Sequence, residues 1–257
     1  MRDLLHLAAS ARERRKRGLT VIEGVHLCEA FVQGGGAPRE VFVTRQGLAH
    51  AEVGALLGQC AAEPTLLSEQ LFGAASAVEQ GVGLLMVIDT PRPQLPGRID
   101  ADSVYLDRLQ DPGNVGTILR TCAATGVRRV FTAPGTAWCW SPKVLRAAMG
   151  AHFHVHLHES VAWHEIEARL AVAARAATLG AASTLWDTDL RPPAIWLFGQ
   201  EGSGLAPELL ARAGQQVLIP QSEAVESLNV GVAAALCLYE QIRQRRAAGQ
   251  GRGICSS

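Results

Sequence analysis

The sequence IPQSEAVESLNVGVAAALCLYE, residues 219–240, decides the fold, because it joins the end of a buried strand to a long apolar helix. A polar loop between them carries Ser227, Leu228 and Asn229. The first backbone N–H groups of a helix lack partners within the helix and can hold a ligand. We expect Ser227 to be the N-cap of this helix. At helical spacing, the expected core face consists of Leu228, Val232, Leu236 and Tyr239.

Two earlier segments also lie between an apolar strand and a helix. They are LDRLQDPGNVGTILRTCAATG, residues 106–126, and WLFGQEGSGL, residues 196–205. In the first segment we expect Asn114 to be an N-cap, with Arg120 near the middle of the helix. In the second, three glycines let the backbone approach a ligand closely, and Glu201 stands among them. Each segment alone also fits an ordinary strand-to-helix turn, and the glycine spacing does not match a dinucleotide site.

The order of elements predicts an α/β protein with two domains. Residues 102–246 repeat strand, loop and helix, which favours a parallel sheet with helices on both faces. The proline-rich stretch TPRPQLPGRIDA, residues 90–101, is expected to be a linker. Residues 1–89 then form a smaller α/β domain, and the glycine-rich tail 247–257 is expected to be disordered.

Hydrophobic periodicity predicts the individual elements. The expected helices include residues 19–33, 115–125 and 165–175, and the expected strands include 40–44, 103–109, 129–132 and 153–157. The helix 115–125 is expected to end at Gly126 in the left-handed conformation.

Composition excludes several classes of protein. Hydrophobic residues at 48% and charged residues at 19% describe a globular protein, not a disordered or fibrous one. The sequence shows no membrane span and no signal peptide, so we expect a cytoplasmic protein. The six cysteines form no CxxC pair, which argues against a zinc site or a disulfide framework. A net charge of zero argues against nonspecific coating of nucleic acid.

Together, the three segments closely resemble the three sequence motifs of the SpoU family of RNA ribose 2′-O-methyltransferases, in the SPOUT class. The motifs match as DPGNVGTILRT, FGQEGSGL and IPQSEAVESLNV. Two further stretches resemble the family: SPKVLRAAMGAHF, residues 141–153, and RKRGLTVIEGVHLCEAF, residues 15–31. The resemblance covers nearly the whole chain.

The resemblance implies a C-terminal SPOUT domain with a deep trefoil knot, preceded by a small substrate-binding domain. It implies S-adenosylmethionine in a pocket lined by Gly199, Ile219 and Leu228, no metal, and a homodimer that completes the active site across its interface. Family members with such an N-terminal domain often act on ribosomal RNA. Ribosomal RNA is therefore the expected substrate, with transfer RNA as the alternative.

The resemblance also assigns roles. Arg120 is the central catalytic residue, Asn114 and Asn229 orient the ribose or Arg120, Glu201 holds the arginine or a motif loop, and Ser227 caps the helix beside the methyl donor. A guanidinium does not readily lose a proton, so we expect Arg120 to grip a phosphate and to stabilise the developing alkoxide.

The third motif departs from the family pattern. Gln221 and Glu223 stand where the family usually has methionine and glycine. We expect the loop to sit differently or to bind the donor more weakly. This departure leaves open a catalytically silent RNA-binding or ribosome-assembly factor.

Two further clusters are candidates for binding. The strongest basic patch, expected to contact RNA phosphates, consists of Arg12, Arg14, Arg15, Lys16 and Arg17. A solvated helix face is the alternative for this patch. Alternation along the strand expected near residue 153 would place four histidines on one face: His152, His154, His156 and His158. An exposed or interface strand face is favoured over zinc, because no cysteine or carboxylate pattern accompanies them.

Overall fold

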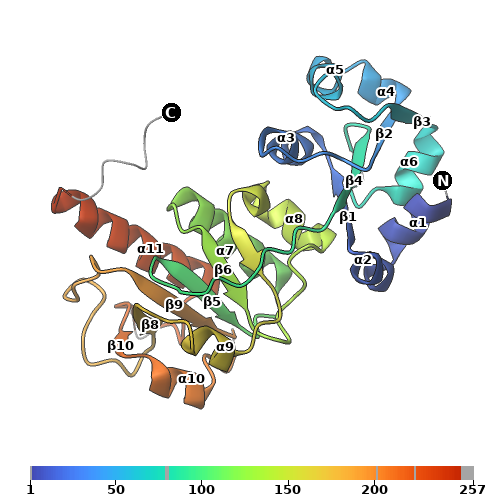
Figure 1. Ribbon diagram of the computed structural model, residues 1–257. Helices are drawn as coiled ribbons and strands as arrows, with labels where there is room; N and C mark the ends of the chain where they lie inside the picture. Colours follow the sequence, from blue (N-terminus) through green and yellow to red (C-terminus); the bar gives the residue numbers. More distant parts are fainter. Residues whose placement is uncertain (1, 79–80, 201, 223, 250–257) are drawn as a thin grey trace. The chain divides into compact units, whose positions relative to one another are not determined.

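The computed structural model describes residues 2–78, 81–200, 202–222 and 224–249 (Figure 1). The chain forms two compact units, each with its own sheet. The first consists of Met1–Pro91 and Trp140–Phe153, and the second consists of Arg92–Cys139 and His154–Ser257. Residues 140–153 therefore belong to the first unit by their contacts, although they fall inside the 102–246 domain expected from the sequence.

The first unit contains a four-stranded mixed sheet. Strands β1 and β2 run antiparallel to β4, while β3 runs parallel to β2, in the order β1-β4-β2-β3. Helices α1 and α6 cover one face, where Leu4, Leu7 and Phe72 pack on Phe42 and Leu85. The elements are α1 (Arg2–Ala9), α2 (Ala11–Arg17), β1 (Leu19–Glu23), α3 (Val25–Gln33), β2 (Glu40–Thr44), α4 (Arg45–Leu48), α5 (Ala51–Leu57), β3 (Pro64–Leu67), α6 (Glu69–Ala75), β4 (Leu84–Asp89), α8 (Pro142–Ala148) and the 3-10 helix η1 (Ala151–Phe153).

The predicted helix over residues 19–33 is wrong in its first part. Leu19–Glu23 forms strand β1, paired along its length with β4, and only Val25–Gln33 is helical. Gly24 separates the two with a φ of 88°, a conformation that favours glycine. The run Leu-Thr-Val-Ile fits a strand because β-branched residues pack well on a pleated sheet.

The second unit contains a parallel six-stranded sheet in the order β10-β8-β9-β5-β6-β7. The predicted parallel α/β architecture of this region is confirmed. Ile166 of α9 and Leu209 of α10 pack on one face of the sheet, and α7 packs against α11 (Figure 1). The elements are β5 (Ser103–Asp107), α7 (Pro112–Ala124), β6 (Arg129–Thr132), β7 (His156–His158), α9 (Trp163–Glu167), β8 (Ala173–Ala177), β9 (Ala194–Gly199), α10 (Pro207–Arg212), β10 (Gln215–Val217) and α11 (Val230–Ala247).

The predicted helix over residues 165–175 is wrong. Helix α9 ends at Glu167, and Ala173–Ala177 forms strand β8 between β9 and β10. Arg175 of β8 is buried and donates hydrogen bonds to Gln215 Oε1 (2.6 Å) and to the carbonyl oxygen of Leu190 (3.0 Å). Burial lowers the pKa of Arg175, and these acceptors offset the loss of water.

The histidines expected on one strand face do not share one. His152 lies in the 3-10 helix η1 and is buried, while β7 contains only His156 and His158. His156 is exposed, whereas His158 is buried and stacks on Phe131 with ring centroids 4.9 Å apart. Within the described ranges, no group of three or more histidine, cysteine or acidic residues could hold a metal ion.

Helix α11 ends at Ala247, so the predicted tail begins at the end of this helix, and its residues 250–257 lie outside the described part. None of the described helices is both long enough and apolar enough to span a bilayer.

Candidate active site

The N-termini of α7 and α11 meet in the second unit. Asn229 Nδ2 donates a hydrogen bond of 2.8 Å to Asn114 Oδ1. These residues lie in the third and first of the three segments identified in the sequence, 115 positions apart. The bond therefore joins two segments that the chain keeps far apart.

Asn229, not Ser227, is the N-cap of α11. Its Oδ1 accepts hydrogen bonds from the backbone N–H groups of Gly231 (2.9 Å) and Val232 (3.2 Å). Ser227 is exposed in the loop two residues earlier. Asn229 thus uses its carbonyl oxygen for the helix and its amide for Asn114.

Asp111, not Asn114, is the N-cap of α7. Its Oδ1 accepts a hydrogen bond of 2.8 Å from the backbone N–H of Asn114, and Pro112 occupies the first helical position. Proline fits there because that position needs no N–H donor. Asn114 is therefore in the first turn of α7, where its Oδ1 accepts the hydrogen bond from Asn229. The helix ends as predicted, with Gly126 at a φ of 75°.

Glycine allows the two helices to pack closely. A Cβ atom on Gly231 would lie 3.1 Å from Thr117 Cγ2. Further along α7, Arg120 is exposed, and its side chain makes no hydrogen bond or ion pair with any described residue. Its guanidinium is therefore available to a ligand.

The second segment forms a tight turn at the end of β9. Gln200 and Gly204 exchange backbone hydrogen bonds of 3.0 and 2.8 Å. A Cβ atom on Gly199 would lie 2.2 Å from both Gly204 C and Leu205 N, so only glycine fits. Glu201, the carboxylate expected to act here, lies outside the described residues.

Asp107, which sequence reasoning missed, connects the first and second segments. Its buried carboxylate accepts from Ala206 N (3.0 Å) and from Arg108 Nε and Nη2 (both 3.0 Å). The hydrogen bonds and the charge of Asp107 raise the pKa of Arg108. The bond to Ala206 fixes the start of α10, directly after the glycine-rich turn. The sequence feature that could have identified Asp107 is an acidic residue at the end of an otherwise apolar strand.

Replacement of Asp107 by alanine should lower the free energy of unfolding by about 1–3 kcal/mol, because it removes a buried carboxylate that accepts three partly buried hydrogen bonds. Urea denaturation followed by circular dichroism measures this loss. The matched control is Asp189→Ala, which breaks an exposed pair with Arg191 (2.8 Å) and should cost under about 1 kcal/mol. Equal costs for the two variants would contradict the assigned role of Asp107.

The third segment begins two residues after the end of β10 and continues into α11. Ile219 is buried and Leu228 is partly buried. Gln221 Nε2 donates to the carbonyl oxygens of Val225 (3.2 Å) and Glu226 (3.3 Å). Gln221 therefore holds this loop together from within. Glu223 lies outside the described residues.

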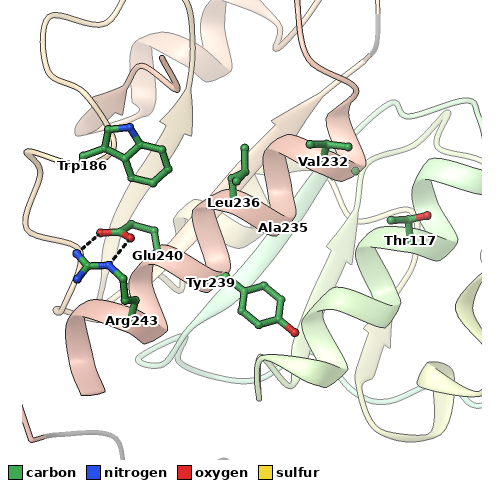
Figure 2. A pocket seen from close by; sticks show the side chains of 9 residues that line it. Thr117, Trp186, Val232, Ala235, Leu236, Tyr239, Glu240 and Arg243 are labelled. Atoms are coloured by element: carbon green, nitrogen blue, oxygen red, sulfur yellow. Dashed lines mark hydrogen bonds and ion pairs between the residues drawn. The ribbon is translucent and has the colours of Figure 1, made fainter. Parts of the chain in front are cut away.

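The expected core face of α11 is wrong, because two of its four residues are exposed and the other two are only partly buried. Val232 and Tyr239 are 49% and 53% exposed, and Trp186 beside them is 48% exposed. These side chains line a hollow of about 600 Å³, together with Thr117 of α7. Figure 2 shows them along α11, with the Glu240–Arg243 ion pair towards the other end of the helix. The two side chains of this pair are 2.7 Å apart. The buried face of the helix consists instead of Val230, Gly231, Ala234, Cys237, Leu238, Glu240, Gln241 and Ile242.

The basic patch of the first unit lacks one of its expected members. Arg14 is buried, and its guanidinium donates to the carbonyl oxygens of Leu7 and of Ala8, the latter at 2.8 Å. Arg14 therefore satisfies the C-terminal carbonyls of α1, and the expectation that it contacts RNA is wrong. The other four members, Arg12, Arg15, Lys16 and Arg17, are exposed on α2, and Arg17 forms an ion pair with Asp3 (3.6 Å).

Comparison with known proteins matches these features to one family. The model of the SpoU rRNA Methylase family matches residues 102–239. An uncharacterized tRNA/rRNA methyltransferase of Synechocystis is 35% identical, over 91% of this chain and 88% of its own. The 23S rRNA (guanosine(2553)-2′-O)-methyltransferase RlmP of Bacillus subtilis is 31% identical, over 89% and 90%.

A solved structure shows the same fold. The SpoU methyltransferase AviRb of Streptomyces viridochromogenes, in complex with AdoMet, superposes with a TM-score of 0.84 at 24% identity, over 96% of this chain and 98% of its own. The family model covers more than half of the chain, including the three motifs DPGNVGTILRT, FGQEGSGL and IPQSEAVESLNV. This chain belongs to the SpoU rRNA methylase family.

Proposed function

We propose that the protein is an S-adenosylmethionine-dependent RNA ribose 2′-O-methyltransferase that acts on ribosomal RNA in the cytoplasm. The observation that carries this proposal is the Asn229–Asn114 hydrogen bond of 2.8 Å. It brings two family motifs together at the N-termini of α7 and α11. Helix α7 also bears Arg120, which has no partner among the described residues. The Bacillus subtilis relative, a 23S rRNA 2′-O-methyltransferase, supports ribosomal RNA over transfer RNA.

Three loops offer groups that fit the methyl donor. Gly199, Ile219 and Leu228 combine a close backbone turn with apolar side chains, which suits an adenosyl group and a thioether chain. When bound, S-adenosylmethionine supplies a methyl group already activated on a sulfonium. The enzyme then needs mainly to align the ribose and to ease the loss of its hydroxyl proton.

The side chains of the protein divide this work. Arg120 grips an RNA phosphate and stabilises negative charge that develops on the 2′-oxygen. Asn114 and Asn229 hold each other through their hydrogen bond and orient the ribose or Arg120. Ser227 lies in the loop beside the methyl donor, and Glu201 steadies Arg120 or a motif loop.

We also assign the second unit the trefoil knot of the SPOUT class. Family membership supports this assignment, and so does the path of the chain after β10. Leu218 N donates to the carbonyl oxygen of Ser183 (2.9 Å), and Leu185 N donates to that of Leu218 (2.8 Å). The segment before the third motif thus lies along the connection that follows β8. Residues 1–89 would be the RNA-binding domain and residues 90–101 the linker.

The apolar face of α11 supports a homodimer. Val232, Tyr239 and Trp186 expose large apolar surfaces around one hollow, and contiguous patches of this kind mark interaction sites. We assign a second copy of this chain to the face, because the hollow begins at Gly231 and Thr117, next to the Asn114–Asn229 pair. A partner seated there would complete the active site.

Two substitutions of Asn229 distinguish its role in stability from its role in methylation. Asn229→Ala removes the N-cap of α11 and should lower stability by about 1 kcal/mol. Asn229→Asp keeps the capping oxygen but loses the donor to Asn114, so it should retain stability while methylation falls sharply. Thermal melts and a tritium-transfer assay with S-adenosylmethionine measure the two effects. Full activity in the aspartate variant would contradict the role of the amide pair.

The proposed function is tested by ribose-methylation maps of total RNA from cells with and without this protein. We expect one 2′-O-methyl site of ribosomal RNA to disappear. Loss of a methylation site in transfer RNA instead would show that transfer RNA is the substrate. If no site disappears and calorimetry detects no binding of S-adenosylmethionine, the protein is a silent RNA-binding factor and the enzyme proposal fails.

A further inference from the structure

Residues 140–153 pack into the first unit. Trp140 is buried and packs against His152 and Phe153, with ring centroids 4.8 and 6.0 Å away. Phe153 also contacts Phe31 of α3 at 5.2 Å. A Cβ atom on Gly150 would lie 3.0 Å from Ala30 Cβ, so the segment lies close against α3. Groups on its outer surface are therefore held in place.

The outer face of α8 carries two unpaired cations. Lys143 and Arg146 are exposed and stand three positions apart, which makes them neighbours on one helix face. Neither makes an ion pair within the described ranges, and α8 contains no acidic residue in its first turn. Among the residues that the structure describes, no acidic group neutralises these two cations.

Lys143 opposes the electrostatics of its own helix. Ser141 is the N-cap and Pro142 follows, so Lys143 occupies the first turn. The positive end of the helix dipole favours acidic groups there and disfavours a lysine. Helix stability therefore does not explain this residue.

Met149 is strained and exposed at the end of the same helix. It ends α8 with a φ of 49°, and its side chain is 54% exposed. A left-handed conformation costs a residue other than glycine roughly 1–2 kcal/mol, and glycine or asparagine usually occupies this position. Strain of this kind clusters at functional sites.

We propose that the outer face of α8, defined by Lys143, Arg146 and Met149, is an RNA-binding surface of the first unit, separate from the basic patch of α2. Lys143 and Arg146 contact phosphates of the substrate RNA, and Met149 packs on an unstacked base or ribose. The inference rests on the proposed function and adds a substrate contact outside the three motifs.

Lysine labelling provides a direct test, because the chain contains only two lysines, Lys16 and Lys143. The probe is protein-free 23S ribosomal RNA, and acetylation of each lysine in the full-length protein is followed by mass spectrometry. We expect saturating RNA to slow acetylation of Lys143 several-fold. Protection of Lys16 alone, with Lys143 labelled at its RNA-free rate, would overturn the proposal. If RNA does not bind at all, the proposed function fails as well.

Matched variants give a second readout. Lys143→Ala with Arg146→Ala should weaken RNA binding roughly tenfold and lower the salt slope by about 1.5, while binding of S-adenosylmethionine stays unchanged. The control removes two exposed arginines of the same unit, Arg2→Ala with Arg45→Ala, and should bind RNA like the wild type. Equal RNA affinity in the two double variants would refute the proposal that the α8 face binds RNA.

Met149→Gly distinguishes a binding role from a structural one. Glycine relieves the left-handed strain, so the variant should be as stable as the wild type or more stable. RNA binding should nevertheless weaken, because the exposed side chain is gone. Unchanged RNA affinity in this variant would show that Met149 is not part of the proposed RNA-binding surface.

Discussion

Replacement of Arg120 by alanine should lower the rate of methyl transfer by about 10²–10³-fold or more, with little change in the affinity for S-adenosylmethionine. The guanidinium is exposed on α7 and has no partner among the described residues, so its loss leaves no buried group unpaired. The expected defect is therefore in the reaction and not in folding. Thermal melts should show a change of less than about 0.5 kcal/mol, as for surface substitutions in general.

The loss should appear in kcat more than in the binding of the donor. Arg120 acts on the phosphate and on charge that develops on the 2′-oxygen, so its contribution is largest in the transition state. Arg120→Lys keeps the charge but loses the planar fork that grips phosphate with two bonds, and it should recover only part of the rate.

Arg128→Ala is the matched control for Arg120. Arg128 is an exposed arginine just after α7, and its side chain makes no ion pair within the described ranges. Its removal should leave methylation unchanged. If Arg120→Ala retains wild-type turnover while Arg128→Ala does not, the assignment of the catalytic arginine is wrong. Calorimetry with S-adenosylhomocysteine confirms that both variants keep the donor pocket.

Sequence reasoning placed the three candidate segments correctly relative to strands and helices, but it assigned their internal contacts less well. The three segments were placed correctly at strand ends, because strand, loop and helix alternate clearly around them. The caps were misassigned in both helices, since Asp111 and Asn229 take the positions expected for Asn114 and Ser227. Serine, aspartate and asparagine are nearly equal as N-caps, so propensity alone cannot rank neighbouring candidates.

Strand β8 shows where local propensity fails. Its sequence, Ala-Ala-Arg-Ala-Ala, favours a helix, because alanine and arginine are strong helix formers. Burial between β9 and β10 overrides that preference, and Arg175 finds its acceptors on Gln215 and Leu190, far along the chain. Such partners are visible only in the folded structure.

The exposed face of α11 shows a second limit of prediction from the sequence. Hydrophobic periodicity identifies a stripe that avoids water, but it does not say what covers the stripe. Val232, Leu236 and Tyr239 fit a core pattern, yet the chain itself leaves Val232 and Tyr239 about half exposed. A subunit interface produces the same sequence pattern as a core, and this is why we assign a second copy to that face.

Val232→Glu combined with Tyr239→Glu should convert the protein from a dimer to a monomer. Two carboxylates in an apolar interface would lose their water without gaining partners, which costs several kcal/mol when they are buried against a second copy. In the monomer both positions remain about half exposed, so folding should be preserved. Sedimentation velocity at micromolar concentration measures the change, and circular dichroism checks the fold.

The control introduces the same charge at another exposed apolar position. Leu66 of β3 is 49% exposed, and Leu66→Glu should leave the protein dimeric. Methylation should fall with dimer content in the α11 variant, because the hollow adjoins the Asn114–Asn229 pair that holds the two motifs together. A variant that remains dimeric would exclude this face as the interface. A monomeric variant with full activity would show instead that each chain carries a complete active site.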